Sequence, residues 1–196
     1  MSFINDKTKE INCKIVYYGP PRSGKSTTLR KIYEHARQES KVGLVSLNEG
    51  DERTLYFDFV PLNLGKIKNY TVRLHLYTVP GEIGYKSSRE LTSKGLDGVV
   101  FVADSQLTQV EANIASLKSL KEILVKEGHD PVNLPMVFQY NKRDLSTAVP
   151  AKELSTVLNT NGFDEFESVA TTGQGVFEVL QSIAKKVLLD LKRQEV

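Results

Sequence analysis

The sequence is poor in cysteine, in net charge and in long apolar runs, and each shortage excludes a class of protein. Its one cysteine, Cys13, cannot form an intramolecular disulfide, which fits a reducing compartment. The 26 basic and 24 acidic side chains give a formal net charge of +2, which is too balanced to indicate a nucleic-acid partner. No apolar run approaches the roughly 20 residues that a membrane-spanning helix requires. Cys13 itself lies in an apolar run, so we expect it to be a small buried core residue.

The two ends of the sequence lack the common targeting signals. Residues 1–7 are too polar for a signal peptide. Myristoylation requires a glycine after Met1, where Ser2 stands, and prenylation requires a cysteine near the end, where the last residues are RQEV. We therefore expect a cytoplasmic protein with no lipid anchor or transmembrane segment, which reaches any membrane through a partner or a non-covalent surface.

The 196 residues suit one α/β domain, so we expect a single domain over residues 1–196. Hydrophobic periodicity predicts strands at residues 11–18, 71–77, 98–103, 135–140 and 166–169. It predicts helices at residues 25–38, 108–126, 151–158 and 175–193. Strands that alternate with helices of this length indicate a mostly parallel sheet with helices on both faces. In such sheets ligands bind at the carboxyl ends of the strands, which is where the motifs fall.

A phosphate-binding loop follows the first predicted strand, with the pattern Gly19-x-x-x-x-Gly24-Lys25-Ser26. The glycines allow the backbone to wrap closely, so that its N–H groups point at phosphate oxygens. Lys25 would neutralise the β- and γ-phosphates, and the Ser26 hydroxyl would be a ligand of Mg²⁺. Because the pattern stands between a predicted strand and a predicted helix, a chance match is improbable.

A second motif, with Asn141, Lys142 and Asp144, follows a later predicted strand. The Asp144 carboxylate can accept from both N1–H and N2–H₂ of guanine, a donor pair that adenine lacks. Asn141 can donate to the acceptor edge of guanine, and the Lys142 stem can lie over the ring. The Ala170 N–H, after the next strand, is a candidate donor to guanine O6. Together with the phosphate loop, these residues predict a guanine nucleotide as ligand.

Five segments carry a family resemblance that spans nearly the whole chain. They are residues 14–20 (KIVYYGP), 51–55 (DERTL), 74–81 (LHLYTVPG), 98–105 (GVVFVADS) and 141–145 (NKRDL). In these segments the sequence resembles the Ras-like small GTPases, and most closely those of the bacterial MglA type, which control cell polarity and gliding motility. The resemblance implies a P-loop GTPase fold and a molecular switch that cycles between GTP and GDP states.

The resemblance also implies roles for residues that no local pattern identifies. Thr54 matches the threonine of the first switch, which senses the γ-phosphate through Mg²⁺, and Arg53 matches an arginine finger carried in cis. Gly81 matches the glycine of the second switch, whose N–H contacts the γ-phosphate. Thr78 stands where Ras-like proteins usually have an aspartate, a change that MglA types share. The implied partners are a Roadblock-domain GTPase-activating protein of the MglB kind and polarity effectors, which could recruit the chain to a cell pole.

Three positions depart from what a fast GTPase requires. Glu82 stands where the family usually has glutamine, and a carboxylate can accept a hydrogen bond from the attacking water but cannot donate one to the transition state. Pro21 lacks an N–H for the phosphates and stiffens the loop. Arg22 stands beside the nucleotide, where it could pair with Glu82, with phosphate or with solvent.

We therefore expect slow intrinsic hydrolysis that depends on a partner, and the alternative is a nucleotide-locked scaffold with negligible hydrolysis. An ATPase or kinase is a third reading, which Asp144 disfavours.

The expected site falls into three sets. The catalytic set is Arg53, Glu82 and Thr54, and the metal ligands are Ser26 and Thr54. The nucleotide-binding set is Gly19, Pro21, Arg22, Ser23, Gly24, Lys25, Ser26, Thr27, Gly81, Asn141, Lys142, Asp144, Ala170 and Thr171.

Overall fold

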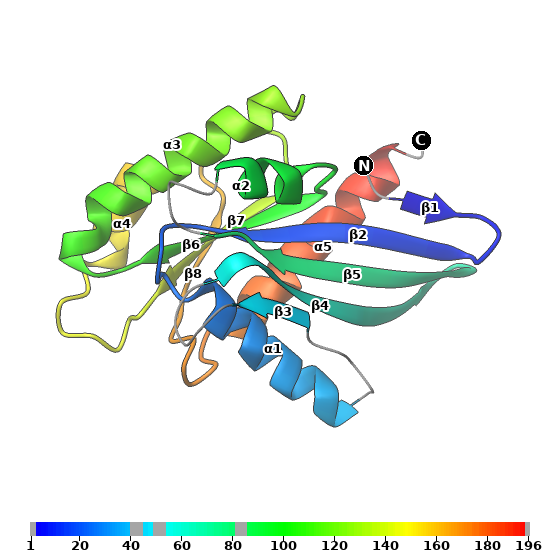
Figure 1. Ribbon diagram of the computed structural model, residues 1–196, viewed down its shortest axis with the longest axis horizontal. Coiled ribbons are helices and arrows are strands. Elements are labelled where there is room, and N and C mark those ends of the chain that lie inside the picture. Colours follow the sequence, from blue (N-terminus) through cyan, green and yellow to red (C-terminus); the bar gives the residue numbers. More distant parts are fainter. Residues whose placement is uncertain (1–2, 40–44, 49–53, 81–85, 195–196) are drawn as a thin grey trace.

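The computed structural model describes residues 3–39, 45–48, 54–80 and 86–194, in which strands and helices alternate (Figure 1). The strands are β1 (Phe3–Asn5), β2 (Glu10–Tyr18), β3 (Val45–Asn48), β4 (Thr54–Ile67), β5 (Tyr70–Thr78), β6 (Gly98–Asp104), β7 (Met136–Asn141) and β8 (Asp164–Glu167). The helices are α1 (Lys25–Glu39), α2 (Lys86–Ser93), the 3₁₀ helix η2 (Leu107–Gln109), α3 (Val110–Lys126), α4 (Ala151–Leu158) and α5 (Val176–Gln194). No helix in these described ranges is long and apolar enough to cross a membrane.

The strands form one sheet in the order β3-β4-β5-β2-β6-β7-β8, with β1 paired to β2 outside this path. The pairs from β5 through β8 are parallel, whereas β3–β4 and β4–β5 are antiparallel. β6 joins β2 only from Ile15 onward, which leaves the first part of that edge open, and β1 pairs there antiparallel with residues 10–12. The expected mostly parallel sheet is therefore confirmed, with an antiparallel extension at one side.

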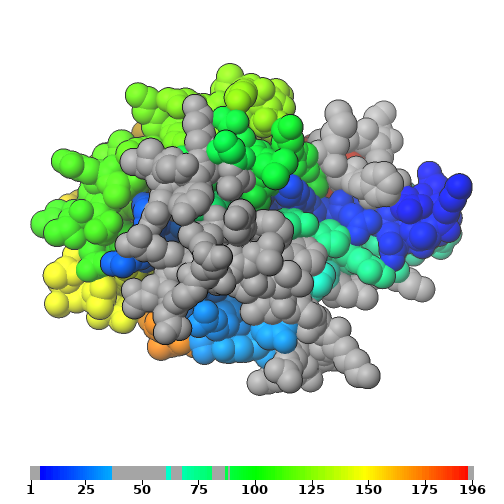
Figure 2. All heavy atoms as spheres, in the orientation of Figure 1, coloured from blue at the N-terminus to red at the C-terminus, as the bar shows by residue number. Residues whose placement is uncertain are grey.

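Helices cover both faces of the sheet, as the alternation predicts (Figure 1). A separate apolar core fills each side. On one face α1 and α5 pack against inward side chains such as Ile15 and Val137. On the other face α3 and α4 pack against Val16 and Phe138. Successive residues of a strand point to opposite faces, so neighbouring residues of one strand belong to different cores. The space-filling view shows the start of β2 at one end of the molecule and α4 at the other (Figure 2).

The buried cysteine is confirmed, since Cys13 is fully enclosed in the core between the sheet and α1 and α5. Burial raises the pKa of its thiol to about 12. The thiolate is the reactive form of cysteine, so this side chain acts as a small apolar core residue.

The sequence missed β1, β3, β4 and α2, and it placed β8 two residues too late. β4 contains Pro61 and Gly65, which ordinarily argue against a strand, and its register with β5 shifts between Asn63 and Lys66. β8 lies at the edge of the sheet and is mostly exposed, so its sequence, DEFE, has no apolar pattern to reveal it. The remaining predicted elements match the structure to within a few residues.

Candidate functional site

The predicted motifs meet at the carboxyl edge of the parallel strands. The phosphate loop follows β2, Asp104 ends β6, and Asn141 ends β7. Because β6 and β7 are parallel and in register, Asp104 and Asn141 are direct neighbours. The segment that contains Ala170 follows β8 and completes the same edge.

Two glycines of the phosphate loop occupy positions that no other residue could fill without displacing its neighbours. A Cβ on Gly19, at φ +151°, would lie 2.1 Å from the Val102 carbonyl oxygen. A Cβ on Gly24, at φ +102°, would lie 2.1 Å from Asn141 Nδ2. The loop therefore passes so close to β6 and β7 that only glycine fits at either position.

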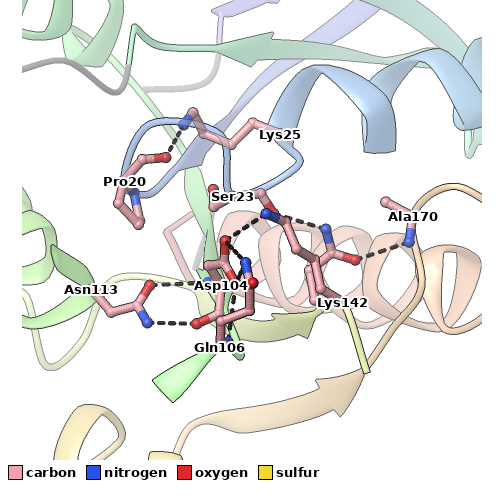
Figure 3. A network of polar contacts seen from close by, with 9 residues as sticks. Pro20, Ser23, Lys25, Asp104, Gln106, Asn113, Lys142 and Ala170 are labelled. Carbon is pink, nitrogen blue, oxygen red and sulfur yellow. Dashed lines mark hydrogen bonds and ion pairs between the residues drawn. The ribbon is translucent and has the colours of Figure 1, made fainter. Parts of the chain in front are cut away.

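Lys25 is buried and folds back across the loop that precedes it (Figure 3). Its ammonium group donates to the carbonyl oxygens of Gly19, at 2.9 Å, and Pro20, at 2.7 Å. These contacts fix the cation at the start of α1, where the helix dipole also favours anions. The loop and helix together form a ready site for phosphate.

Two of the three departures from the family pattern lie at the tip of the loop. Pro21 and Arg22 are both exposed, and Arg22 has φ +59°, in the left-handed region that non-glycine residues rarely enter. Ser23 is fully buried beneath them, whereas Ser26 and Thr27 in the first turn of α1 are half-buried.

Asn141 joins the phosphate loop to the segment after β8. Its Nδ2 donates to the Ser23 carbonyl oxygen at 2.8 Å, and its Oδ1 accepts from the Ala170 N–H at 2.9 Å. The sequence had suggested that Asn141 and Ala170 contact guanine directly. The structure pairs them with each other and with the loop, so both hold the walls of the site together, and their contacts with guanine stay a prediction.

Sequence reasoning missed one member of the site, Asp104. Its carboxylate is buried and lies 2.6 Å from Lys142 Nζ, and it accepts from the backbone N–H of Gln106 at 3.1 Å (Figure 3). Asn113 of α3 clamps the Asp104 backbone, because its Oδ1 accepts from the N–H and its Nδ2 donates to the carbonyl oxygen. The available signal was an aspartate that directly ends the wholly apolar run of residues 98–103.

Asp144 is exposed on a turn that is anchored at its base. The Leu145 N–H donates to the Lys142 carbonyl oxygen, and Lys142 itself has φ +66°. Arg143 Nε lies 2.6 Å from Glu167 Oε2, which ties the turn to β8. The Asp144 carboxylate is therefore held on a fixed backbone but stays accessible to a ligand, and Thr171 is exposed on the neighbouring segment.

The predicted switch residues are only partly covered by the structure. Arg53, Gly81 and Glu82 lie outside the described residues. Thr54 is the first residue of β4 and pairs with Asn48 of β3, but the description of Thr54 does not extend to its side chain. Thr78, which stands where an aspartate is usual, ends β5 and is fully buried.

Comparison with known proteins agrees with this arrangement. The family model of the ADP-ribosylation factor family matches residues 1–187. The chain is 52% identical over 193 residues to the mutual gliding-motility protein MglA of Myxococcus xanthus (strain DK1622), covering 98% of this chain and 99% of that protein. It is 23% identical over 191 residues to ADP-ribosylation factor-like protein 6 of Caenorhabditis elegans, covering 91% and 87%.

These matches confirm the predicted fold class, and they favour a hydrolysing switch over a nucleotide-locked scaffold. The chain therefore belongs to the ADP-ribosylation factor family of Ras-like small GTPases, in its MglA-type branch, and is a GTP-binding switch that hydrolyses GTP.

Proposed function

We propose that the carboxyl edge of the sheet binds GTP and GDP, with the phosphates in the loop of residues 19–27 and the base over the turn of residues 141–144. The observation that carries this proposal is the Asn141 amide, which donates to the Ser23 carbonyl oxygen at 2.8 Å. This bond fixes the spacing between the phosphate loop and the turn that carries Asp144. A fixed spacing supports one ligand that spans the loop and the turn, because binding then loses less conformational entropy in ordering these two segments.

The phosphate end would be held by backbone N–H groups and by Lys25. The two carbonyl oxygens that hold Lys25 keep its charge in place before a ligand arrives. Binding then loses little side-chain entropy at this lysine. Pro21 reduces the number of N–H donors in the loop, and Arg22 offers a cation at its exposed tip.

At the base half of the site, Asp144 would recognise the guanine ring and the stem of Lys142 would lie over it. A carboxylate that accepts two hydrogen bonds from guanine would be left unpaired by adenine. The ion pair of Lys142 with Asp104 holds the lysine stem at the end of β7. Ala170 and Thr171 form the adjoining wall of the base site.

Mg²⁺ fits the donors available here, with Ser26 and Thr54 as the protein ligands. Mg²⁺ prefers oxygen ligands and usually keeps waters and substrate phosphate oxygens in its shell. Ser26 lies in the first turn of α1, beside the proposed phosphate site, and its hydroxyl is an oxygen donor of the kind that Mg²⁺ prefers. When bound, the ion would neutralise charge that develops on the phosphates.

Hydrolysis would depend on the switch residues and proceed slowly without a partner. Thr54 and Gly81 would sense the γ-phosphate, and Arg53 would act as a finger in cis. Glu82 cannot donate to the transition state as glutamine does. An arginine finger is worth roughly 10³–10⁵ in rate, so Arg53 could offset Glu82 once a partner orders both.

The relative from Myxococcus xanthus is named for gliding motility, and we extend that kind of role to this chain. The GTP state would recruit polarity and motility effectors at a cell pole. A Roadblock-domain partner of the MglB kind would accelerate hydrolysis and return the switch to its GDP state.

The base site is tested with Asp144→Asn. Replacing the carboxylate by an amide should weaken GDP binding by about a hundredfold or more, and it should strengthen binding of xanthosine diphosphate, whose ring accepts where guanine donates. Titration of fluorescent GDP and competition with the xanthine nucleotide measure both effects. Asp130→Asn, at an exposed carboxylate before β7, is the control and should bind GDP normally. Unchanged GDP affinity in Asp144→Asn would contradict this base site.

The hydrolysis proposal is tested with Glu82→Gln in single-turnover assays, with and without a Roadblock-domain partner. Glutamine restores an amide that can both donate and accept, so we expect turnover to rise by about tenfold or more. Arg53→Ala measured in parallel should lose most of the partner-stimulated rate. If Glu82→Gln leaves both rates unchanged, the proposed defect at this position is wrong.

A further inference from the structure

The strand β7 carries a buried amide that the function described so far does not use. Gln139 is fully buried in the middle of this strand. Alternate residues of a strand share a face, so Gln139 lies on the same face as Val137 and Asn141. Val137 belongs to the apolar core beneath α1 and α5, and an apolar side chain would be expected at Gln139 too.

The amide nitrogen of Gln139 joins two segments that approach the site from different directions. Nε2 donates to Thr28 Oγ1 at 3.1 Å and to Ser168 Oγ at 3.0 Å. Thr28 stands on α1, three residues after Lys25, and Ser168 stands between β8 and Ala170. One buried side chain therefore links the helix of the phosphate site to the segment of the base site.

Ser168 extends this hydrogen-bond network to Asn141. Its Oγ already accepts from Gln139, and it lies 3.2 Å from Asn141 Oδ1, to which its hydroxyl can donate. Asn141 Oδ1 also accepts from the Ala170 N–H, so two donors hold this end of the amide. The opposite end, Nδ2, is thereby kept toward the Ser23 carbonyl oxygen of the phosphate loop.

The same amide is only partly paired. Among the described residues the buried Gln139 Oε1 has no hydrogen-bond partner. An unpaired buried carbonyl costs free energy, and an apolar side chain of similar volume would avoid that loss. A contribution to folding alone therefore does not account for an amide at this position.

We infer that Gln139 is a positioning residue that couples the phosphate and base halves of the nucleotide site through Ser168 and Asn141. The inference rests on the proposed function, because it concerns how that site holds its ligand. The nucleotide dissociates only when both the phosphate half and the base half of the site release it. The hydrogen bonds through Gln139 and Ser168 make the opening of one half depend on the opening of the other. Loosening the link therefore accelerates release more than it disturbs the fold.

The test is Gln139→Met, which keeps the volume and removes both donors. We expect fluorescent GDP to dissociate about three- to tenfold faster, the equivalent of one net hydrogen bond. Inosine diphosphate lacks the exocyclic amine of guanine. The ratio of the affinity for GDP to the affinity for inosine diphosphate should decrease as well. The melting temperature of the nucleotide-free protein should stay equal or rise, because the unpaired carbonyl is gone.

Two further variants separate positioning from general packing. Ser168→Ala removes the hydroxyl that connects Gln139 to Asn141, and so it breaks the same chain of hydrogen bonds. The double variant with Gln139→Met should therefore release GDP no faster than the faster of the two single variants. Tyr140→Phe removes a hydrogen bond to Glu165 on the other face of β7 and is the matched control, with wild-type release expected.

A wild-type dissociation rate in Gln139→Met would overturn the inference, and so would equal acceleration by Tyr140→Phe. A lower melting temperature in Gln139→Met with unchanged GDP release would assign the residue to folding alone. Failure of the wild-type protein to bind GDP at all would instead remove the proposed function itself.

Discussion

At the scale of single residues, Asp104 shows how a buried charge can serve a site by holding another side chain in place. Its carboxylate is almost wholly buried, whereas 28% of the Lys142 side chain is exposed. Charge-assisted hydrogen bonds are roughly twice as strong as neutral ones, so this pair holds the lysine firmly. Because Asn113 clamps the Asp104 backbone, α3 supports the base motif from behind.

We predict that Asp104→Asn accelerates GDP release. The amide can still accept from the Gln106 N–H, but it no longer offers a charge to Lys142. The partial exposure of the lysine lowers the loss below that of a fully buried pair, to about 1–2 kcal/mol, or about tenfold in rate. Stopped-flow dissociation of fluorescent GDP measures it. Glu90→Gln, which removes an ion pair between α2 and α3, is the control, and equal rates in both variants would refute the role of Asp104.

A row of polar contacts links β2 and β5 on the face opposite α1 and α5. Glu10 pairs with Arg73 at 2.6 Å, and His75 Nε2 donates to Asn12 Oδ1 at 2.7 Å. Burial, with Arg73 nearby, lowers the pKa of His75 below its ordinary value of 6.5, whereas Glu10 opposes the shift. The folded state therefore binds a proton at His75 less readily than the unfolded chain does.

This shift predicts a loss of stability in mild acid. Below pH 6.5 the unfolded state takes up a proton at His75 before the folded state does, so the free energy of unfolding falls as the pH drops. His75→Gln keeps a donor for Asn12 and removes the titration, so its stability should fall less between pH 7.5 and 5.5. Urea unfolding at the two pH values measures the difference. Burial also lowers the pKa of His129, so the variant should retain part of the effect.

At the scale of elements, α5 crosses β6 at a glycine. A Cβ on Gly98 would lie 2.7 Å from Val187 Cγ2 and 3.1 Å from Ile183 Cδ1. Both residues belong to the buried face of α5. The absence of a side chain at the start of β6 therefore sets how closely the helix approaches the sheet.

We predict that Gly98→Ala destabilises the fold by about 1–3 kcal/mol, because the added methyl overpacks this crossing. GDP release should stay at the wild-type rate, since Gly98 lies at the amino end of β6 and the site lies at the carboxyl end. Combining it with Val187→Ala should cost less than the sum of the single changes, as one methyl fills the space that the other leaves. Strictly additive losses in urea unfolding would contradict this contact.

The elements themselves were predictable where their pattern is strong. α5 and β6 are long or wholly apolar, and the sequence predicts both. β4 and α2 were missed because their residues follow no clear period, and pairing with β5 or packing beside α3 decides their structure. β8 was placed late because Val169, its apparent apolar end, forms an isolated bridge with Gln174 after the strand.

At the scale of the whole molecule, the parallel topology gathers the site from distant parts of the chain. Ser23 and Asn141 are 118 residues apart in sequence, and Thr28 and Gln139 are 111 apart. Each pair meets because strands β2, β6 and β7 run side by side and end at the same edge. Opening any one of these strands would disturb both halves of the site.

The phosphate loop, the guanine motif and the α/β architecture can be recognised in the amino-acid sequence alone, because spacing, glycines and periodicity are local properties of a chain. Three contacts emerge only from the fold: Asn141 bonds to Ala170, Asp104 holds Lys142, and Gln139 joins the two halves of the site. These contacts link residues from separate strands and loops, and local periodicity carries no information about which distant side chains meet. The folded sheet brings them together at hydrogen-bonding distance.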